Sequence, residues 1–355
     1  MQLKAIGQLL ARVGTAFALA SGACALMAAG TAQAAVTSHK LSGIETQISC
    51  LSSSSCVAVG ERGNRGSVIT LKNGTQSHTA TLRGSSLIYS VSCPSKSGCW
   101  AIGDPKSGAG AYLVKINSAG RVTSARTIGV PAGADLGRIS CSSMSSCEVV
   151  GTDIFVSPTA IEIGTWNGSK LHVYRVKGVK GGVALSMEGI SCWHADCEAV
   201  GDVLAGSSEH GLILTTRNGR PGKLHKASDY SLYGVSCVSA SRCYAAGYRA
   251  ASPAGLVVTV SGGVAGHLQT TAGDLFGIEC AGSKCVAAGE VLNTEPPASQ
   301  IYDGVLLTLS GGTATGSPQV VAASGGYSGI ASRGGRGFIS IGAPPSGSGT
   351  EVTSG

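Results

Sequence analysis

The stretch Ile48-Ser49-Cys50-Leu51-Ser52-Ser53-Ser54-Ser55-Cys56-Val57-Ala58-Val59-Gly60 contains a phrase that recurs along the chain. The phrase is Ile or Val, a Ser or Glu, a Cys, four or five residues, a second Cys, and a small apolar run that ends in Gly. The cysteine pairs are Cys50 and Cys56, Cys93 and Cys99, Cys141 and Cys147, Cys192 and Cys197, Cys237 and Cys243, and Cys280 and Cys285. A seventh copy, without cysteines, begins at Ile330.

The spacing of the copies predicts their architecture. Successive first cysteines are 43, 48, 51, 45 and 43 residues apart, and Ser332 stands 52 residues further on, where a seventh would be. A period of about 40 to 50 residues is typical of a propeller blade or a helical repeat. The apolar runs, such as 57–60, are too short and too rich in glycine for helices, so strands are favoured.

Each copy is predicted to form four strands, which in the first copy span 47–50, 56–59, 67–71 and 77–82. The dipeptide Asn73-Gly74 is a strong signal for the hairpin between the last two. The cysteines then flank the loop between the two innermost strands, where cross-strand neighbours are close enough for a disulfide.

The first residues after the leader echo an outer strand. Residues 36–43 resemble 76–84, which precede the second blade. We therefore expect the N-terminal segment to complete the last blade beside strands 329–332, 338–342 and 350–353, which removes an exposed sheet edge. The predicted fold is an all-β, seven-bladed β-propeller of four-stranded antiparallel blades, closed by the N-terminal strand, with one intrablade disulfide in six blades. It would form one domain over 35–355, with blades starting near residues 47, 90, 138, 189, 234, 277 and 329.

The N-terminus is typical of a secretory signal peptide over 1–34. Lys4 and Arg12 precede or open an apolar, alanine-rich stretch, and Ala32-Gln33-Ala34 is a small-x-small cleavage signal. A lipoprotein anchored at Cys24 is the alternative. No later stretch is long and apolar enough to span a bilayer, which predicts a secreted, monomeric protein.

Twelve of the 13 cysteines remain after the predicted cleavage, all of them in the repeats. An even count in an exported chain favours disulfides. Zinc sites usually bring together cysteines two to four residues apart, so we predict no metal, with free thiols as the remaining alternative. The formal charge of +7 is dispersed, which argues against nucleic acid as a partner, and no cofactor is predicted.

The phrase 48–60, with Gly66-Ser67-Val68-Ile69-Thr70-Leu71 and Asn73-Gly74, resembles the repeat of BNR-like propellers. These include the sialidase-like and the photosystem II assembly factor families. The chain is still more similar to the disulfide-bearing variant found in exported actinobacterial proteins. The resemblance implies a fold and no particular activity. A sialidase would require an Asp-box turn and an arginine cluster. Residues 162–166 are one residue short of that turn, and the cluster has no counterpart, so no catalytic residue is carried over.

Two sets of residues are predicted to lie on one face and to bind a ligand. Carboxylates follow the second strand of five copies, at Glu61, Asp104, Asp153, Asp202 and Glu290. They form either a ring that attracts a cation or basic ligand, or polar strand ends that help turns. Aromatic residues precede the first cysteine position by four or five residues, at Tyr89, Tyr233, Phe276 and Tyr327. They either stack on sugars or anchor a peptide, or pack beneath the loops.

Other candidates carry less weight. His39, His78, His172, His225 and His267 recur on outer strands. Spread around a rim, they cannot converge on one ion. The segment Trp193-His194-Ala195-Asp196 fills one disulfide loop. It forms either a small contact site for a ligand or a turn whose side chains have no binding role.

No nucleophile elbow, phosphate-binding loop or zinc-protease motif occurs. We therefore expect a non-catalytic binding or scaffold protein at the cell envelope or extracellular surface, with an envelope glycan or another exported protein as partner. The alternative is a carbohydrate-active enzyme acting on extracellular glycans, for which Glu188 and Asp202 would be the paired acids.

Overall fold

The computed structural model describes residues 37–153, 160–249, 254–292, 302–321, 325–342 and 350–354. The predicted signal peptide and Cys24 lie outside these residues. Within them the chain is almost entirely antiparallel strand, with one 3-10 turn at Gly334–Arg336. No helix in the described part of the chain has the length and apolarity needed to cross a membrane.

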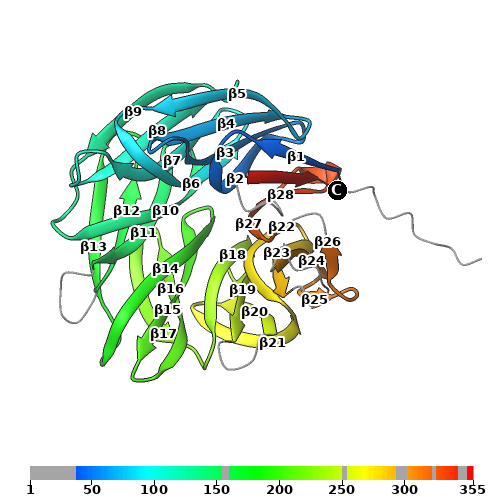
Figure 1. Ribbon diagram of the computed structural model, residues 1–355. Helices are drawn as coiled ribbons and strands as arrows, with labels where there is room; N and C mark the ends of the chain where they lie inside the picture. The colour runs from blue at the N-terminus through cyan, green and yellow to red at the C-terminus, as the bar shows by residue number, and fades with distance from the viewer. Residues whose placement is uncertain are drawn as a thin grey trace, which may run out of the picture. The chain divides into compact units, whose positions relative to one another are not determined.

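Six sheets each come from one copy of the repeat, with strands in chain order from the innermost to the outermost (Figure 1). The first three are β2 (Ile44–Ser52), β3 (Ser55–Glu61), β4 (Gly66–Lys72) and β5 (Thr75–Leu82); β6 (Ser85–Ser95), β7 (Gly98–Pro105), β8 (Ala111–Asn117) and β9 (Val122–Ile128); and β10 (Ala134–Ser143), β11 (Ser146–Asp153), β12 (Ala160–Trp166) and β13 (Leu171–Lys177). The next three are β14 (Gly182–Trp193), β15 (Asp196–Ala205), β16 (Ser208–Arg217) and β17 (Arg220–Lys226); β18 (Ser231–Ser239), β19 (Arg242–Arg249), β20 (Ala254–Ser261) and β21 (Val264–Ala272); and β22 (Asp274–Ala281), β23 (Lys284–Leu292), β24 (Tyr302–Ser310), β25 (Thr313–Ala314) and β26 (Gln319–Val321).

A further sheet joins the two ends of the described chain. Its strands are β27 (Tyr327–Ser332), β28 (Phe338–Gly342), β29 (Thr350–Ser354) and β1 (Thr37–Leu41), in that order. β1 pairs antiparallel with β29, and Figure 1 shows the blue N-terminal strand beside the red C-terminal one. The N-terminal strand therefore completes this sheet, as the sequence predicted.

The predicted count of seven blades is wrong and is corrected to six, whereas the N-terminal closure and the lack of a disulfide in the last copy agree with the prediction. Among the described residues, the complete blades built from a single repeat number six rather than seven. The last copy supplies only three strands, since its outermost position is filled by β1 from the other end of the chain, and it has no disulfide. The sixth blade also departs from four strands, because β25 and β26 both pair with β24.

The innermost strands contact one another in chain order, and β27 contacts β2, which closes the circuit. The hydrophobic core lies between neighbouring sheets. Val59 and Val68 of the first blade pack with Ile88, Val91 and Tyr112 of the second. Aliphatic side chains form most of these interfaces, and a few aromatic residues such as Tyr112 and Trp166 complete them.

All six predicted disulfides are confirmed, each joining the two innermost strands of one blade. Their Cα–Cα distances lie between 3.8 and 4.1 Å. Cys50 and Cys56 stand directly opposite each other in the strand register, as do four of the other five pairs.

The serine of the repeated phrase has a structural role. Ser49 Oγ accepts a hydrogen bond from the backbone N–H of Cys93 in the next blade, at 3.0 Å. The same bond joins every following pair of disulfide-bearing blades, at 2.9 to 3.1 Å. In the sixth blade Glu279 replaces the serine and accepts from the N–H of Ser332 in the terminal sheet. These bonds link the blades around the circuit and explain why a small hydroxyl residue precedes the first cysteine.

Candidate functional site

A cavity of about 760 Å³ runs along the innermost strands of all seven sheets. Its lining includes the first cysteine of five blades and residues three or four positions before a first cysteine, such as Thr46, Arg138 and Glu188. Cavities of this size lie within the range of ligand pockets.

Every innermost strand carries a β-bulge at the same position, four residues before its first cysteine or the equivalent Ser332. A bulge leaves one residue unpaired and redirects its side chain. We call these seven residues the bulge ring. They are Thr46, Tyr89, Gly137, Glu188, Tyr233, Phe276 and Ser328, and all except Gly137 line the cavity.

The bulge also explains the glycine that ends the apolar run of every copy. In the second blade, a Cβ on Gly103 would lie 2.1 Å from the carbonyl oxygen of Leu87, on the innermost strand just before the bulge. In the sixth blade, a Cβ on Gly289 would lie 1.8 Å from the carbonyl oxygen of Asp274. Only glycine permits this close approach of two backbones.

The repeat therefore separates constant positions from variable ones. The β-branched residue, the serine, the cysteines and the glycine recur because they pack, bond or admit the bulge. The bulge ring, in contrast, holds polar, charged, aromatic and small residues on the same backbone geometry. Variable side chains on a constant scaffold, opening onto a cavity, form the candidate functional site.

The aromatic part of the bulge ring belongs to the fifth and sixth blades. The ring of Tyr233 stacks on Tyr248, with centroids 5.5 Å apart and planes at 17°. It meets Phe276 edge-on, at 5.5 Å and 86°. Both predicted aromatic residues are half-buried and face the cavity, so they offer apolar contact surface to a ligand.

The charged part adjoins Tyr233. Glu188 accepts a hydrogen bond from Arg138 Nη2 at 2.7 Å and another from the hydroxyl of Ser186. Burial, and then the charges of Glu188 and Glu209, raise the pKa of Asp202 to about 6. Asp202 and Glu188 thus share one negative region, which Arg138 neutralises only in part.

On the second blade, Tyr89 donates a hydrogen bond from its hydroxyl to Asp104 Oδ2, at 2.5 Å. Burial and this bond raise the pKa of Tyr89 above its usual range. Here a predicted carboxylate holds a predicted aromatic residue in place, so Asp104 supports the bulge ring rather than facing the cavity itself.

The other predicted residues lie elsewhere or contribute differently. Glu290 lines the cavity, and burial raises its pKa, with a contribution from Asp274. Tyr327 precedes the bulge and is only 1% exposed; it packs beside Ile330 and is also among the residues that line the cavity. Glu61 lies in a separate shallow depression beside Arg62. The side chain of Asp153 falls outside the described side chains.

Three neighbouring residues were not predicted as site residues, namely Arg138, Tyr248 and Glu209. Tyr248 stands after the blade's glycine, where other copies have a carboxylate, so alignment of the repeats could have found it. Arg138 follows a bulge, and its contact with Glu188 of the next blade depends on tertiary structure.

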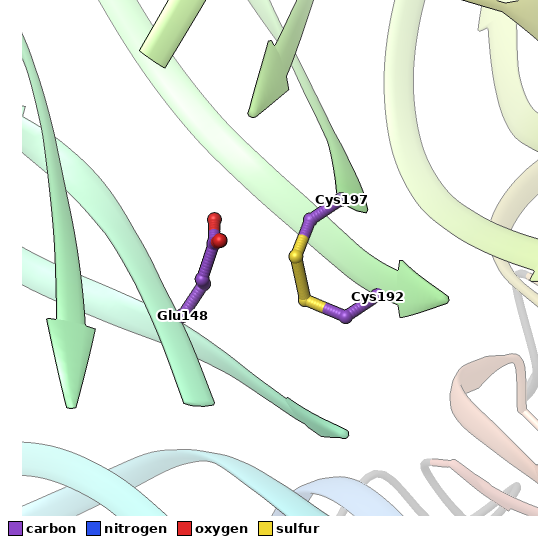
Figure 2. Close-up of side chains that lie close together, drawn as sticks. All are labelled: Glu148, Cys192 and Cys197. Carbon is purple, nitrogen blue, oxygen red and sulfur yellow. A yellow bond between two sulfur atoms is a disulfide. The ribbon is translucent and has the colours of Figure 1, made fainter. Parts of the chain in front are cut away.

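One further cluster brings Glu148 within 4.8 Å of the sulfur atoms of Cys192 and Cys197 (Figure 2). The two sulfurs are bonded to each other and therefore supply no thiolate ligand. Glu148 accepts bonds from Thr216 and from the Gly219 backbone of the next blade, and burial raises its pKa to about 7. The cluster thus joins two blades.

Comparison with known proteins shows the fold and nothing finer. No protein-family model and no curated protein sequence matches the chain. Among solved structures, it is similar to YCF48 bound to D1 peptide, at 14% identity and a TM-score of 0.56, covering 90% of this chain and 96% of that one. The WD40 propeller domain of Doa1 is 12% identical, with a TM-score of 0.57, and the match covers 90% of this chain and 95% of that one. Hydrazine synthase of Kuenenia stuttgartiensis is 11% identical, with a TM-score of 0.59, and the match covers 89% of this chain and 97% of that one. These similarities show a β-propeller.

Proposed function

We propose that the protein is a secreted, non-catalytic binding protein that holds a segment of another exported protein at the bulge ring. The observation that carries the proposal is the contrast within the repeat between a constant scaffold and variable side chains at the end of one cavity. Six disulfides and the leader-like N-terminus support an extracellular location.

A protein segment suits the site better than a small metabolite does. Aromatic rings, carboxylates and one arginine are spread over consecutive blades around the cavity, which fits an extended ligand with several side chains. One similar propeller, YCF48, was solved with a peptide, which supports this class of ligand.

A display library of random peptides, selected on the purified chain, tests the proposal. Selected peptides should lose at least about tenfold in affinity against a Tyr233→Ala, Phe276→Ala double variant, since buried aromatic anchors carry much of an interface's energy. Tyr302→Ala, which removes an exposed aromatic side chain outside the bulge ring, is the matched control.

Undiminished binding by the double variant would contradict the proposal. The carbohydrate-active alternative remains a second outcome of the same work. Incubation with envelope glycans that releases reducing ends, and loses that activity in Glu188→Gln and Asp202→Asn, would replace binding by catalysis.

A further inference from the structure

We propose that the sector of the bulge ring formed by Glu188, Tyr233 and Phe276 binds an alkylammonium group, the head of a lysine side chain on the partner segment. The inference rests on the proposed function and specifies its ligand chemistry.

The aromatic geometry is the first support. Tyr233 and Phe276 come from adjacent blades and meet at 86°, so their rings form two walls of a corner beside the cavity. The face of an aromatic ring attracts a cation through its quadrupole, and two walls at a steep angle let a cation contact both. Tyr248 stacks behind Tyr233 and fixes the orientation of that wall.

The charge around this corner is the second support. Glu188 lines the cavity together with Tyr233 and Phe276. Burial, then the hydrogen bond with Tyr248, and then the charges of Asp202 and Glu188 raise the pKa of Tyr233. Glu209 adds a third negative charge near Asp202, while Ser231 donates a hydrogen bond to it at 3.0 Å. Arg138 forms an ion pair with Glu188. A cation entering here would relieve the repulsion among the three acids.

The combination selects an organic cation over a bare metal ion. Calcium prefers six to eight oxygen ligands, and aromatic walls supply none. A lysine side chain offers a four-carbon stem that packs on the rings and an ammonium that donates to carboxylates. Arginine would present its planar group to the same rings, so the guanidinium is the closest competitor.

Calorimetric titration of the purified chain at pH 7.5 provides the test. The probes are a short peptide with a single lysine, the same peptide with that lysine Nε-acetylated, its arginine version, and calcium chloride. We expect the lysine peptide to bind at least about fivefold more tightly than the acetylated one, consistent with the loss of one cation–π contact and its charge pairing.

Two substitutions locate the site. Asp202→Asn removes a charge without changing shape, and Phe276→Leu removes the ring face while keeping an apolar side chain. Each should weaken lysine-peptide binding about fivefold or more, whereas Glu61→Gln, which changes a carboxylate in a separate depression on the first blade, should change it less than twofold. Circular dichroism and non-reducing peptide mapping verify that each variant is folded.

The pH profile gives an independent readout. Asp202 faces Glu188, Glu209 and Tyr233, and its pKa lies near 6. Binding of the lysine peptide should weaken as pH falls from 7.5 to 5, because protonation removes the negative charge, and Asp202→Asn should flatten this change.

Equal binding of the lysine and acetylated peptides would overturn the inference, as would a preference for arginine or calcium. If selected peptides bind at the bulge ring without needing lysine, the proposed function stands and this inference fails. If the double variant of the bulge ring binds selected peptides normally, both fail.

Discussion

The backbone N–H of Cys192 donates a hydrogen bond to Ser140 Oγ at 3.0 Å, joining the fourth blade to the third. The donor belongs to the disulfide and the acceptor to the residue preceding the neighbouring blade's first cysteine. The two halves of the repeated phrase therefore act across the blade interface as well as within a blade.

Ser140→Ala should lower the free energy of unfolding by about 1–2 kcal/mol, because the Cys192 N–H loses its partner in a partly buried setting. Urea titration followed by circular dichroism measures the change. Ser261→Ala, an exposed serine at the end of β20, serves as the control and should shift stability by less than about 0.5 kcal/mol. Equal effects of the two substitutions would argue against the interblade bond.

Glu279→Gln should change how stability depends on pH. Burial raises the pKa of Glu279 to about 7, above its ordinary value of 4.5. The folded state therefore holds the proton more tightly, and the resulting stabilisation is complete below pH 4.5 and is lost as pH rises through 7. The midpoint temperature of thermal unfolding should fall less steeply between pH 4 and 8 in Glu279→Gln than in the wild type. Glu61→Gln, which takes no part in the interblade hydrogen bonds described above, should keep the wild-type pH dependence.

Gly103→Ala should destabilise the protein by at least about 2 kcal/mol, because the new Cβ would lie 2.1 Å from the Leu87 carbonyl oxygen. Gly137→Ala tests a glycine that is itself in the bulge ring and meets nothing within 4 Å. It should leave the thermal midpoint nearly unchanged. A tolerated alanine at position 103 would mean that the bulge is not required there.

The Cys50→Ala, Cys56→Ala double variant should have a free energy of unfolding about 2 kcal/mol lower than the wild type. This is the loop-closure contribution expected for a disulfide that closes so short a loop. Chemical denaturation of the oxidised chain and of the double variant gives the difference. Peptide mapping without reductant should find each cysteine joined to its own blade's partner, and links between distant copies would contradict the assigned pairing.

The repeat predicted the strands, the disulfides and the N-terminal closure because these follow from local spacing and alternation. It did not predict the bulge, since the residues of the first four blades at this position, Thr46, Tyr89, Gly137 and Glu188, share no chemistry and only the strand register marks them. For the same reason the sequence does not separate Tyr327 from Tyr233, although the bulge of the terminal sheet falls one residue after Tyr327, which is almost fully buried. The count of seven blades was wrong, because among the described residues only six copies of the repeat build a complete sheet by themselves.

The sequence reveals some residues of the candidate site, whereas others are recognised only from the tertiary structure. Phe276 and Tyr233 could be found because aromatic residues are sparse and stand at a fixed offset from the cysteines. The ion pair of Arg138 with Glu188 joins residues of two blades, 50 positions apart, so no local pattern reveals it.

The pairing of β1 with β29 has a consequence for how the chain reaches its native state. β1 and β29 meet only after everything between them has been made, so the circuit cannot be sealed while the chain is still being synthesised. Until then the contact between β27 and β2 is missing, and the unclosed array exposes strand edges that the native state pairs. Loss of the final few residues would thus open the molecule at its beginning as well as at its end.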